Sequence, residues 1–442
     1  MVISNGYGKY PLASAAVEAH DRGFLDAFIT GAYPKGKPRR SLEATPLRRK
    51  YRGFLARQVA LPESVVYDLW LPEVIHEAAR LAVYRRPAAV SDLLTTAAHM
   101  AYGRSASRVL EKLHTMRFIY HYRSGFGGKS LETAERAGAI TLCDHTIVHP
   151  ATLDYLIRHE GRMPSGPIRN VRSHMWRGVL ADVQRADHVV VNSEFVRDTF
   201  ANQEFPIERV HVVPWGVDDG FLHTASRVPE RVVHDGPLRL LFAGSVERRK
   251  GAHVLCEALK GVTDVPWRLD VLGGLEPWIS HRYKSFFEDP RVRLHGTVPR
   301  VELSRYMCEA EVFIFPSLAE GSARVVMEAM ALGCFIITTP NSGSIIHDPE
   351  NGLLVAPGDP SALAAAIRRA ASLGPELVAT ANRNRQTVLT RFRQRDFGEA
   401  LERLYLELAE HEQQRVGDRP SASLKRRNSR TTLREPAQGS IP

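Results

Sequence analysis

The feature that most constrains this chain is a regular alternation of short apolar runs with longer stretches of helical character. In the first half the runs cover residues 2–4, 27–31, 118–122, 139–143, 189–192 and 210–214. In the second half they cover residues 238–244, 269–273, 292–296, 312–316, 335–339 and 353–356. Strands that alternate with helices form βαβ units, and these units build parallel sheets covered by helices. The sequence therefore predicts an α/β protein with two parallel sheets.

Several of the predicted strands end in small residues or in proline. These ends are Gly244, Gly273-Gly274, Pro316-Ser317 and Thr338-Thr339-Pro340. Open α/β sheets bind ligands beyond the carboxyl ends of their strands, and small residues there let a ligand approach the backbone. We therefore expect a binding site at this edge of the second sheet.

Residues 215–237 divide the chain, because glycine and proline interrupt them and little periodicity is present. We predict one α/β domain over residues 1–216 and a second over residues 217–395. Residues 396–412 are expected to form a closing amphipathic helix. Its apolar face comprises Phe397, Leu401, Leu404, Tyr405 and Leu408. Residues 413–442 are rich in Ser, Pro, Thr and Arg and lack apolar periodicity, so we predict a disordered basic tail.

Cysteine use and hydropathy indicate the compartment. The cysteines form no CxxC pair; they are Cys143, Cys256, Cys308 and Cys334. We expect them to be reduced, as in the cytoplasm. No run of about 18 apolar residues is present, and the first residues lack a basic and apolar leader. A soluble cytoplasmic protein is therefore expected.

The net charge of +10 is concentrated in two segments. The tail from Gln413 to Pro442 holds seven basic residues against two acidic ones, and Lys35 to Arg52 holds eight against one. One interpretation is a solvated basic surface. Another is peripheral contact with an anionic membrane at its inner face, or with a phosphorylated acceptor, at about 1 kcal/mol per basic residue. Nucleic acid binding is not expected, because the tail has no aromatic side chains for stacking.

The most specific stretch is FIFPSLAEGSARVVMEAMALGCFIITT, residues 313–339. It predicts a strand, a short loop that contains Glu320, and a helix that begins near Ser322 and carries Glu328. The backbone N–H groups of Gly321, Ser322 and Ala323 would lie at the helix N-terminus, which favours anions. Two carboxylates beside an anion site suit a sugar nucleotide: one for sugar hydroxyls, the other for ribose hydroxyls.

A second stretch, LLFAGSVERRKGAHVLCEAL, covers residues 240–259. A strand ends at Gly244, a polar loop carries Arg248, Arg249 and Lys250, and a helix follows Gly251. A cation at a turn between strand and helix is suited to a diphosphate. These positions are therefore candidates for binding the charged part of the ligand.

Together the two stretches resemble the retaining glycosyltransferases of family four, which have the GT-B fold of two Rossmann-like domains around a central cleft. The resemblance covers about residues 189–367. It implies that Lys250-Gly251 binds the donor diphosphate, that Glu320 contacts the donor sugar, and that Glu328 contacts the ribose. It also places the donor in the second domain and the acceptor beside the first.

The sequence departs from this family at Ser245, where many members have an arginine after the strand. Arg248 or Arg249 could supply the missing charge, or Lys250 and backbone N–H groups could suffice. Arg324 is a further candidate, since a cation in the first turn of a helix opposes the helix dipole unless an anion lies nearby. It could equally pair with Glu328, four residues further on.

The first domain carries weaker signals. Gly6 and Gly8 follow its first strand, and the resemblance implies that this loop faces the cleft near the acceptor. The resemblance also implies a histidine against the donor sugar, for which His145 is preferred over His149.

Residues 127–130, GGKS, resemble a phosphate-binding Walker loop. That motif needs a glycine five positions before Gly128, where Arg123 stands. A nucleoside triphosphatase is therefore not expected, and the loop is expected to border the cleft.

These features predict a retaining glycosyltransferase that moves a sugar from a nucleotide-diphosphate sugar to a glycan, lipid-linked or small-molecule acceptor. No DxD spacing is present, so we expect no metal and no cofactor, with Lys250 and the helix N-terminus stabilising the leaving diphosphate. Glu320 and His145 are the predicted catalytic residues. Alternatives are a sugar-nucleotide epimerase, a phosphorylase of the same fold, or a non-catalytic sugar-nucleotide-binding module.

Overall fold

The computed structural model describes residues 1–8, 10–36, 51–83, 88–113 and 118–417. Its first sheet has seven parallel strands in the order β3-β2-β1-β4-β5-β6-β7. The strands are β1 Val2–Ser4, β2 Ala27–Thr30, β3 Val66–Asp68, β4 Ile119–Arg123, β5 Ile140–Asp144, β6 His188–Val191 and β7 Val210–Val212. The second sheet has six parallel strands in the order β10-β9-β8-β11-β12-β13. Its strands are β8 Leu238–Ala243, β9 Trp267–Leu272, β10 Val292–Gly296, β11 Val312–Phe315, β12 Phe335–Thr338 and β13 Leu353–Leu354.

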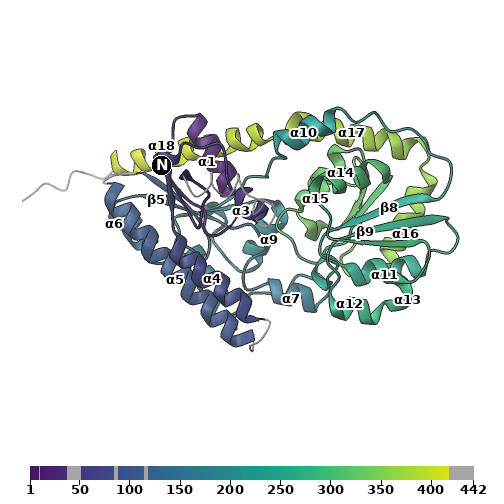
Figure 1. The fold of residues 1–442 in the computed structure, drawn as a ribbon, viewed down its shortest axis with the longest axis horizontal. Coiled ribbons are helices and arrows are strands. Elements are labelled where there is room, and N and C mark those ends of the chain that lie inside the picture. Colours follow the sequence, from purple (N-terminus) through teal and green to yellow (C-terminus); the bar gives the residue numbers. More distant parts are fainter. Residues whose placement is uncertain (9, 37–50, 84–87, 114–117, 418–442) are drawn as a thin grey trace, which may run out of the picture.

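Helices cover both sheets (Figure 1). The longer helices of the first part are α1 Leu12–Asp21, α4 Trp70–Val83, α5 Ala88–Leu113, α6 Gly128–Arg136, α7 Leu153–Arg158, α8 His174–Arg185 and α9 Glu194–Asn202. Those of the second part are α10 Asp219–Ser226, α11 Ala252–Lys260, α12 Pro277–Arg282, α14 Arg300–Glu309, α15 Arg324–Ala331, α16 Pro360–Ser372, α17 Pro375–Arg391 and α18 Gln394–Gly417. Short helices are α3 Arg52–Leu55, η2 Glu63–Val65, η3 Ile207–Arg209, η4 Arg248–Lys250, α13 Lys284–Phe287 and η5 Pro340–Ser342.

The strands are apolar on both faces because each sheet is covered on both sides. Successive side chains of a strand point to opposite faces. Val2 accordingly lies in a core with residues of α5 and α6, whereas the next residue, Ile3, lies in a separate core with residues of α1 and α18. The two parallel sheets predicted from the alternation of strands and helices are therefore confirmed.

Strand β3 is not among the apolar runs predicted for the first half of the chain. The strand has three residues and pairs only with β2, at the edge of the sheet. Three residues are too few for an alternating apolar pattern to stand out. The segment between the sheets likewise contains helix α10, which begins after Asp218; the Asp218 side chain accepts a hydrogen bond from the Phe221 N–H at 3.0 Å.

The closing helix, α18, returns to the first sheet and lies along α1 (Figure 1). All members of its predicted apolar face are buried, namely Phe397, Leu401, Leu404, Tyr405 and Leu408. The helix extends to Gly417, further than the predicted end at residue 412. The predicted disorder of residues 413–442 is therefore wrong for residues 413–417. The rest of that tail, residues 418–442, and most of the basic run from Lys35 to Arg52 lie outside the described residues. The domain boundaries at residues 216 and 395 remain predictions.

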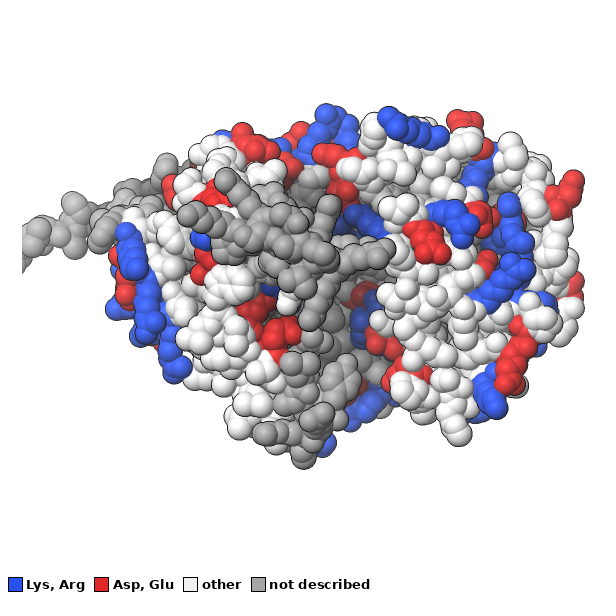
Figure 2. Space-filling model, in the orientation of Figure 1, with Lys and Arg blue, Asp and Glu red and all other residues white. Residues whose placement is uncertain are grey.

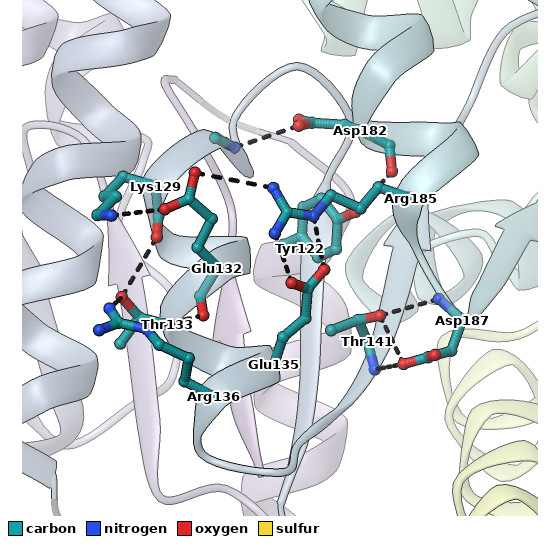
Figure 3. Close-up of polar contacts among 11 residues, drawn as sticks. Tyr122, Lys129, Glu132, Thr133, Glu135, Arg136, Thr141, Asp182, Arg185 and Asp187 are labelled. Carbon is teal, nitrogen blue, oxygen red and sulfur yellow. Dashed lines mark hydrogen bonds and ion pairs between the residues drawn. The ribbon is translucent and has the colours of Figure 1, made fainter.

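The GGKS segment does not form an open phosphate loop. The N–H groups of Gly127 and Gly128 donate to the Asp182 carboxylate of α8, at 2.8 and 3.1 Å (Figure 3). Lys129 pairs with Glu132 at 2.5 Å. Burial raises the pKa of Asp182 to about 6, against the opposing effect of these N–H groups. The protein's own carboxylate thus occupies the place that a phosphate would take, which corrects the expectation that the loop borders a ligand cleft.

Basic and acidic side chains intermingle on the described surface that Figure 2 presents. No helix in the described part of the chain combines the length and apolar character needed to cross a bilayer.

Candidate functional site

A cavity of about 560 Å³ lies beyond the carboxyl ends of strands β8, β9 and β11. It collects the predicted donor-side residues except Arg248, Gly251 and Gly321. The lining includes Gly244, Ser245, Arg249, Lys250, Glu320, Ser322, Ala323, Arg324 and Glu328. Gly244, Gly273 and Gly274 leave the strand ends open, as expected for a ligand site at this edge. We refer to this space as the donor cavity.

The turn η4 brings two cations into the donor cavity, and Gly251 makes the turn possible. Gly251 has φ +72, and a Cβ there would lie 1.9 Å from the carbonyl oxygen of Pro316. Only glycine tolerates both the left-handed conformation and the contact. The Lys-Gly pair therefore has a local physical explanation in addition to its resemblance to a family motif.

Both cations, Arg249 and Lys250, form ion pairs with Glu320. Its Oε1 pairs with the Lys250 ammonium group and with Nη1 of Arg249, the latter at 2.5 Å. Burial lowers the pKa of Lys250, and the neighbouring Glu320 offsets part of that effect. Arg249 also pairs with Glu247 through Nη2 at 2.9 Å, so two carboxylates balance the two cations. Lys250 and Arg249 nonetheless offer charged N–H donors of the kind that bind a diphosphate.

The three arginines that could supply the positive charge missing at Ser245 lie in different places. Arg249 and Arg324 line the donor cavity. Arg248 instead crosses to the first domain, where it pairs with Glu160 and donates to the carbonyl oxygen of Ile157 at 3.3 Å. Arg248 is therefore engaged between the domains, and Arg249 or Arg324 is left for the ligand.

Arg300 is a site residue that sequence reasoning missed. Its guanidinium donates to Glu328 Oε1 at 2.6 Å and pairs with Asp218 at 2.5 Å, and it lies over the Phe221 ring. Glu328 is only 9% exposed. Arg324 lies over the Trp215 ring instead, 5.9 Å from its centroid. No local pattern connects Arg300 with Glu328, because 28 residues separate them in the sequence.

Replacing Arg300 with methionine is expected to raise the donor KM about fivefold with little change in kcat. The ion pair that orients Glu328 would be lost, and half-exposed pairs of this kind contribute about 1 kcal/mol. Initial-rate kinetics with varied donor would measure the effect. Arg305→Met on the same helix is the matched control, because Arg305 is 61% exposed. A lower kcat at unchanged KM would contradict this role.

The expected anion site at the N-terminus of α15 is partly filled by the protein. Ala323 N–H donates to the Ser342 carbonyl oxygen at 2.9 Å. With the Asn192 amide oriented so that its oxygen faces the loop, Ser322 N–H donates to it at 3.3 Å. The helix itself begins at Arg324, two residues later than expected. Of the predicted three N–H groups, two are thus engaged by the protein in this conformation.

His145 lies in a second cavity, of about 370 Å³, which belongs to the first domain. Its Nε2 is 3.1 Å from the Val148 carbonyl oxygen, and its Nδ1 is 2.9 Å from Ser124 Oγ. A carbonyl only accepts, so Nε2 carries the hydrogen and Nδ1 accepts from the serine. Burial lowers the pKa of His145 to about 4, so the ring is neutral near pH 7. His149 packs edge-on against Phe200 and does not line the cavity.

The buried, neutral histidine predicts sensitivity to acid. Between about pH 6.5 and pH 4 the unfolded chain binds a proton at His145 that the folded protein does not bind. The free energy of unfolding should therefore fall as the pH falls through this window, by up to about 1.4 kcal/mol per pH unit. Chemical denaturation at pH 7 and pH 5 should show a smaller loss in His145→Asn than in the unmodified protein. Equal losses of unfolding free energy in the two proteins would contradict the role given to His145.

The glycine loop after β1 contributes Gly8, which lines the second cavity, while Gly6 lies behind it. Both have positive φ, +74 at Gly6 and +69 at Gly8. A Cβ on Gly6 would lie 3.0 Å from the Phe126 ring. Gly6 therefore supports the wall of the cavity, and only Gly8 borders the space itself.

The two cavities adjoin each other where the domains touch. A Cβ on Gly321 would lie 1.8 Å from the Thr146 carbonyl oxygen, and Ser193 Oγ donates to the Gly321 carbonyl oxygen at 2.5 Å. Thr146 lines the cavity of the first domain, and the neighbours of Gly321 line the donor cavity. Groups bound in the two cavities could therefore meet at this contact.

Two α/β domains with a cavity at the strand ends define the class: a GT-B protein. Solved structures with this fold match nearly the whole chain. The glycosyltransferase from Rickettsia africae ESF-5 is 16% identical with a TM-score of 0.58, and covers 92% of this chain and 98% of its own. Sucrose-phosphate synthase from Thermosynechococcus elongatus is 17% identical with a TM-score of 0.62, over 93% and 100%. Anabaena Alr3699/HepE, solved with UDP and glucose, is 14% identical with a TM-score of 0.57, over 92% and 100%.

Similarity to a family of known sequences is found in the second domain. Residues 237–372 match the model for glycosyl transferases group 1, so the second domain is similar to that family over this stretch. The amylovoran biosynthesis glycosyltransferase AmsK of Erwinia amylovora is 29% identical over 45% of this chain and 52% of its own length. A D-inositol 3-phosphate glycosyltransferase of Xylanimonas cellulosilytica is 34% identical over 36% and 42%. The chain spans about half the length of the curated relatives it matches.

Proposed function

We propose that this protein transfers a sugar from a nucleotide-diphosphate sugar to a glycan or lipid-linked acceptor, with retention of configuration and without a divalent metal or cofactor. One observation carries the proposal. Lys250 and Arg249 converge on Glu320 inside a cavity at the strand ends, while Arg300 holds Glu328 on the same cavity. This arrangement offers cations for a diphosphate and carboxylates for hydroxyl groups.

In the proposed reaction the donor diphosphate binds at Lys250 and Arg249, its ribose binds at Glu328, and its sugar faces Glu320. Preorganised positive charge stabilises the leaving diphosphate as negative charge develops on it. Glu320 is held by two cations, which makes it a poor covalent nucleophile. We therefore favour attack from the face of the leaving group, with the leaving phosphate accepting the acceptor's proton.

The proposed role of His145 is to shape the acceptor side. Both of its ring nitrogens are hydrogen-bonded within the protein. Proton transfer through this ring would require the loss of one of those hydrogen bonds. We therefore assign His145 a contact between its ring and the donor sugar, made from the acceptor side, and no role in proton transfer.

Peripheral contact with an anionic membrane is part of the proposal for a lipid-linked acceptor. The first turns of α4 expose Trp70, Leu71 and Val74, which are 47%, 71% and 58% exposed. Exposed apolar side chains along one helix are typical of surfaces that enter the interface of a bilayer. Flotation with phosphatidylglycerol vesicles, compared with phosphatidylcholine vesicles, tests this part; no difference between them would contradict it.

The donor is tested by thermal stabilisation with a panel of UDP-, GDP- and ADP-sugars in the presence of EDTA. A ligand at about 100 times its Kd adds about 2.7 kcal/mol. A shift with one base that is lost in Lys250→Ala supports the proposal and its metal independence. The absence of any shift would contradict it.

Product analysis then distinguishes the reaction classes. Transfer that requires an acceptor supports the proposal. Conversion of the donor without an acceptor would indicate an epimerase, and dependence on inorganic phosphate would indicate a phosphorylase. Binding without turnover would indicate a non-catalytic module.

A further inference from the structure

The second cavity combines an aromatic wall with one arginine, Arg123, that forms no ion pair with the described residues. Its lining includes Tyr10, Phe126 and Trp176, together with Arg123, Thr146 and Glu77. Arg123 is the last residue of β4, at the carboxyl end of the strand that neighbours β1 and β5. This is the edge of the first sheet where a ligand is expected to bind. We call this space the acceptor cavity.

Arg123 is held in place mainly by rings. Its guanidinium carbon lies 3.9 Å from the Tyr10 ring centroid and 5.0 Å from that of Phe126. Among the described residues its hydrogen bonding is limited to one long contact, from Nη1 to the Tyr7 carbonyl oxygen at 3.4 Å. A guanidinium has five N–H donors in a fork that matches phosphate or carboxylate oxygens. Most of these donors are therefore unused by the described residues.

Two acidic groups around this cavity, Asp144 and Glu73, are bonded to other residues, and the charge of Asp144 acts on Arg123 from beyond ion-pair distance. Asp144 accepts from the Tyr10 hydroxyl at 2.9 Å and lies 3.6 Å from His121 Nε2. Glu73 pairs with Arg57 at 2.5 Å and accepts from the Ala32 N–H at 2.6 Å. No carboxylate of the described residues lies within 4.0 Å of the Arg123 guanidinium.

His99 and His145 add no further positive charge to this cavity near pH 7. Burial lowers the pKa of His99 to about 3, and its ring centroid is 4.3 Å from that of Phe126. His145 is neutral for the same reason. Burial also lowers the pKa of Arg123, but an arginine remains charged at neutral pH. The cavity therefore presents a desolvated cation, most of whose N–H donors the described residues leave unused.

We propose that Arg123 recognises an anionic oxygen group, a phosphate ester or a carboxylate, on the acceptor. The inference rests on the proposed function and deepens it by assigning the chemistry of the acceptor. The guanidinium binds the two anionic oxygens, the rings of Tyr10 and Phe126 hold the guanidinium plane, and the Thr146 hydroxyl lies on the same cavity. The hydroxyl that is glycosylated then lies towards Gly321 and the donor cavity.

Matched pairs of small probes test the proposal by titration with ligand-observed NMR. The pairs are glucose 6-phosphate with glucose, and glucuronate with glucose. A polyprenyl-diphosphate-linked sugar in detergent, compared with the neutral polyprenyl glycoside, distinguishes a lipid-linked phosphate from a free one. At least one charged probe should bind about 10- to 100-fold more tightly than its neutral counterpart.

The preference should disappear in Arg123→Met and persist in part in Arg123→Lys. Arg197→Met is the matched control, because Arg197 lies on α9 and is 40% exposed. Thermal shifts with the nucleotide-sugar panel show whether each variant is folded with an intact donor cavity. Equal affinity for charged and neutral probes, or a preference that survives in Arg123→Met, would overturn the proposal. Failure of the proposed function would appear separately, as absence of nucleotide-sugar binding in the unmodified protein.

Discussion

Lys250→Ala is expected to lower kcat/KM for the nucleotide sugar by about 10- to 150-fold. A charge-assisted hydrogen bond contributes about 1.5–3 kcal/mol, and the contact should strengthen as the diphosphate leaves. The fold should survive, because Glu320 keeps its ion pair with Arg249. Initial rates measured with varied donor, together with the Kd of the nucleoside diphosphate, would separate turnover from binding.

Lys260→Ala is the control for this variant. Lys260 lies at the end of the next helix, is 40% exposed, and pairs with Glu257 rather than with the cavity. It should leave both kinetic constants unchanged. A Lys250→Ala protein with unaltered kcat/KM would show that Arg249 or Arg324 carries the diphosphate, and the assignment of Lys250 would be wrong.

Gly321→Ala is expected to weaken the use of the nucleotide sugar about as much as Lys250→Ala does, through a steric clash and without a change in charge. The added Cβ would lie 1.8 Å from the Thr146 carbonyl oxygen, a backbone atom that cannot rotate away. The loops of the two domains would have to separate, which displaces Glu320 and Ser322 from the donor cavity. Overpacking of this kind costs about 1–3 kcal/mol. Thermal unfolding and donor titration should both report the change, as a lower midpoint and a weaker affinity.

Gly274→Ala is the matched control, since Gly274 also lines the donor cavity. The nearest atom to a Cβ there is Thr297 Oγ1 at 3.9 Å, an ordinary contact. Its effect should be much smaller. Similar losses in the two variants would show that the contact between Gly321 and Thr146 is not what holds the donor loop.

Local chemistry made much of the fold predictable. Apolar runs that alternate with helical stretches have few solutions other than parallel sheets covered by helices. The face of α18 was predictable for the same reason, because five apolar residues recur with helical spacing. Strand β3 and the helix α10 were not predictable in this way, because each is short and its stability depends on neighbours elsewhere in the chain.

The candidate site divides along a similar line. Lys250, Glu320 and Glu328 could be selected because each lies in a stretch whose glycines and apolar flanks indicate a strand, a turn and a helix. The sequence did not predict which cation forms an ion pair with which carboxylate. The pair between Arg300 and Glu328, and the diversion of Arg248 to Glu160, join residues that are distant in the sequence.

The sequence by itself determined two parallel α/β sheets, the strand ends where a ligand site is expected, and the residue types available there, because these follow from periodicity and turn chemistry within short windows. Only the tertiary structure decided the rest. It directed Asp182 into the GGKS loop, buried His145 in its neutral form, and left Arg123 without an ionic partner among the described residues. Each of these depends on burial and on which chain segments meet, and a linear pattern contains neither quantity.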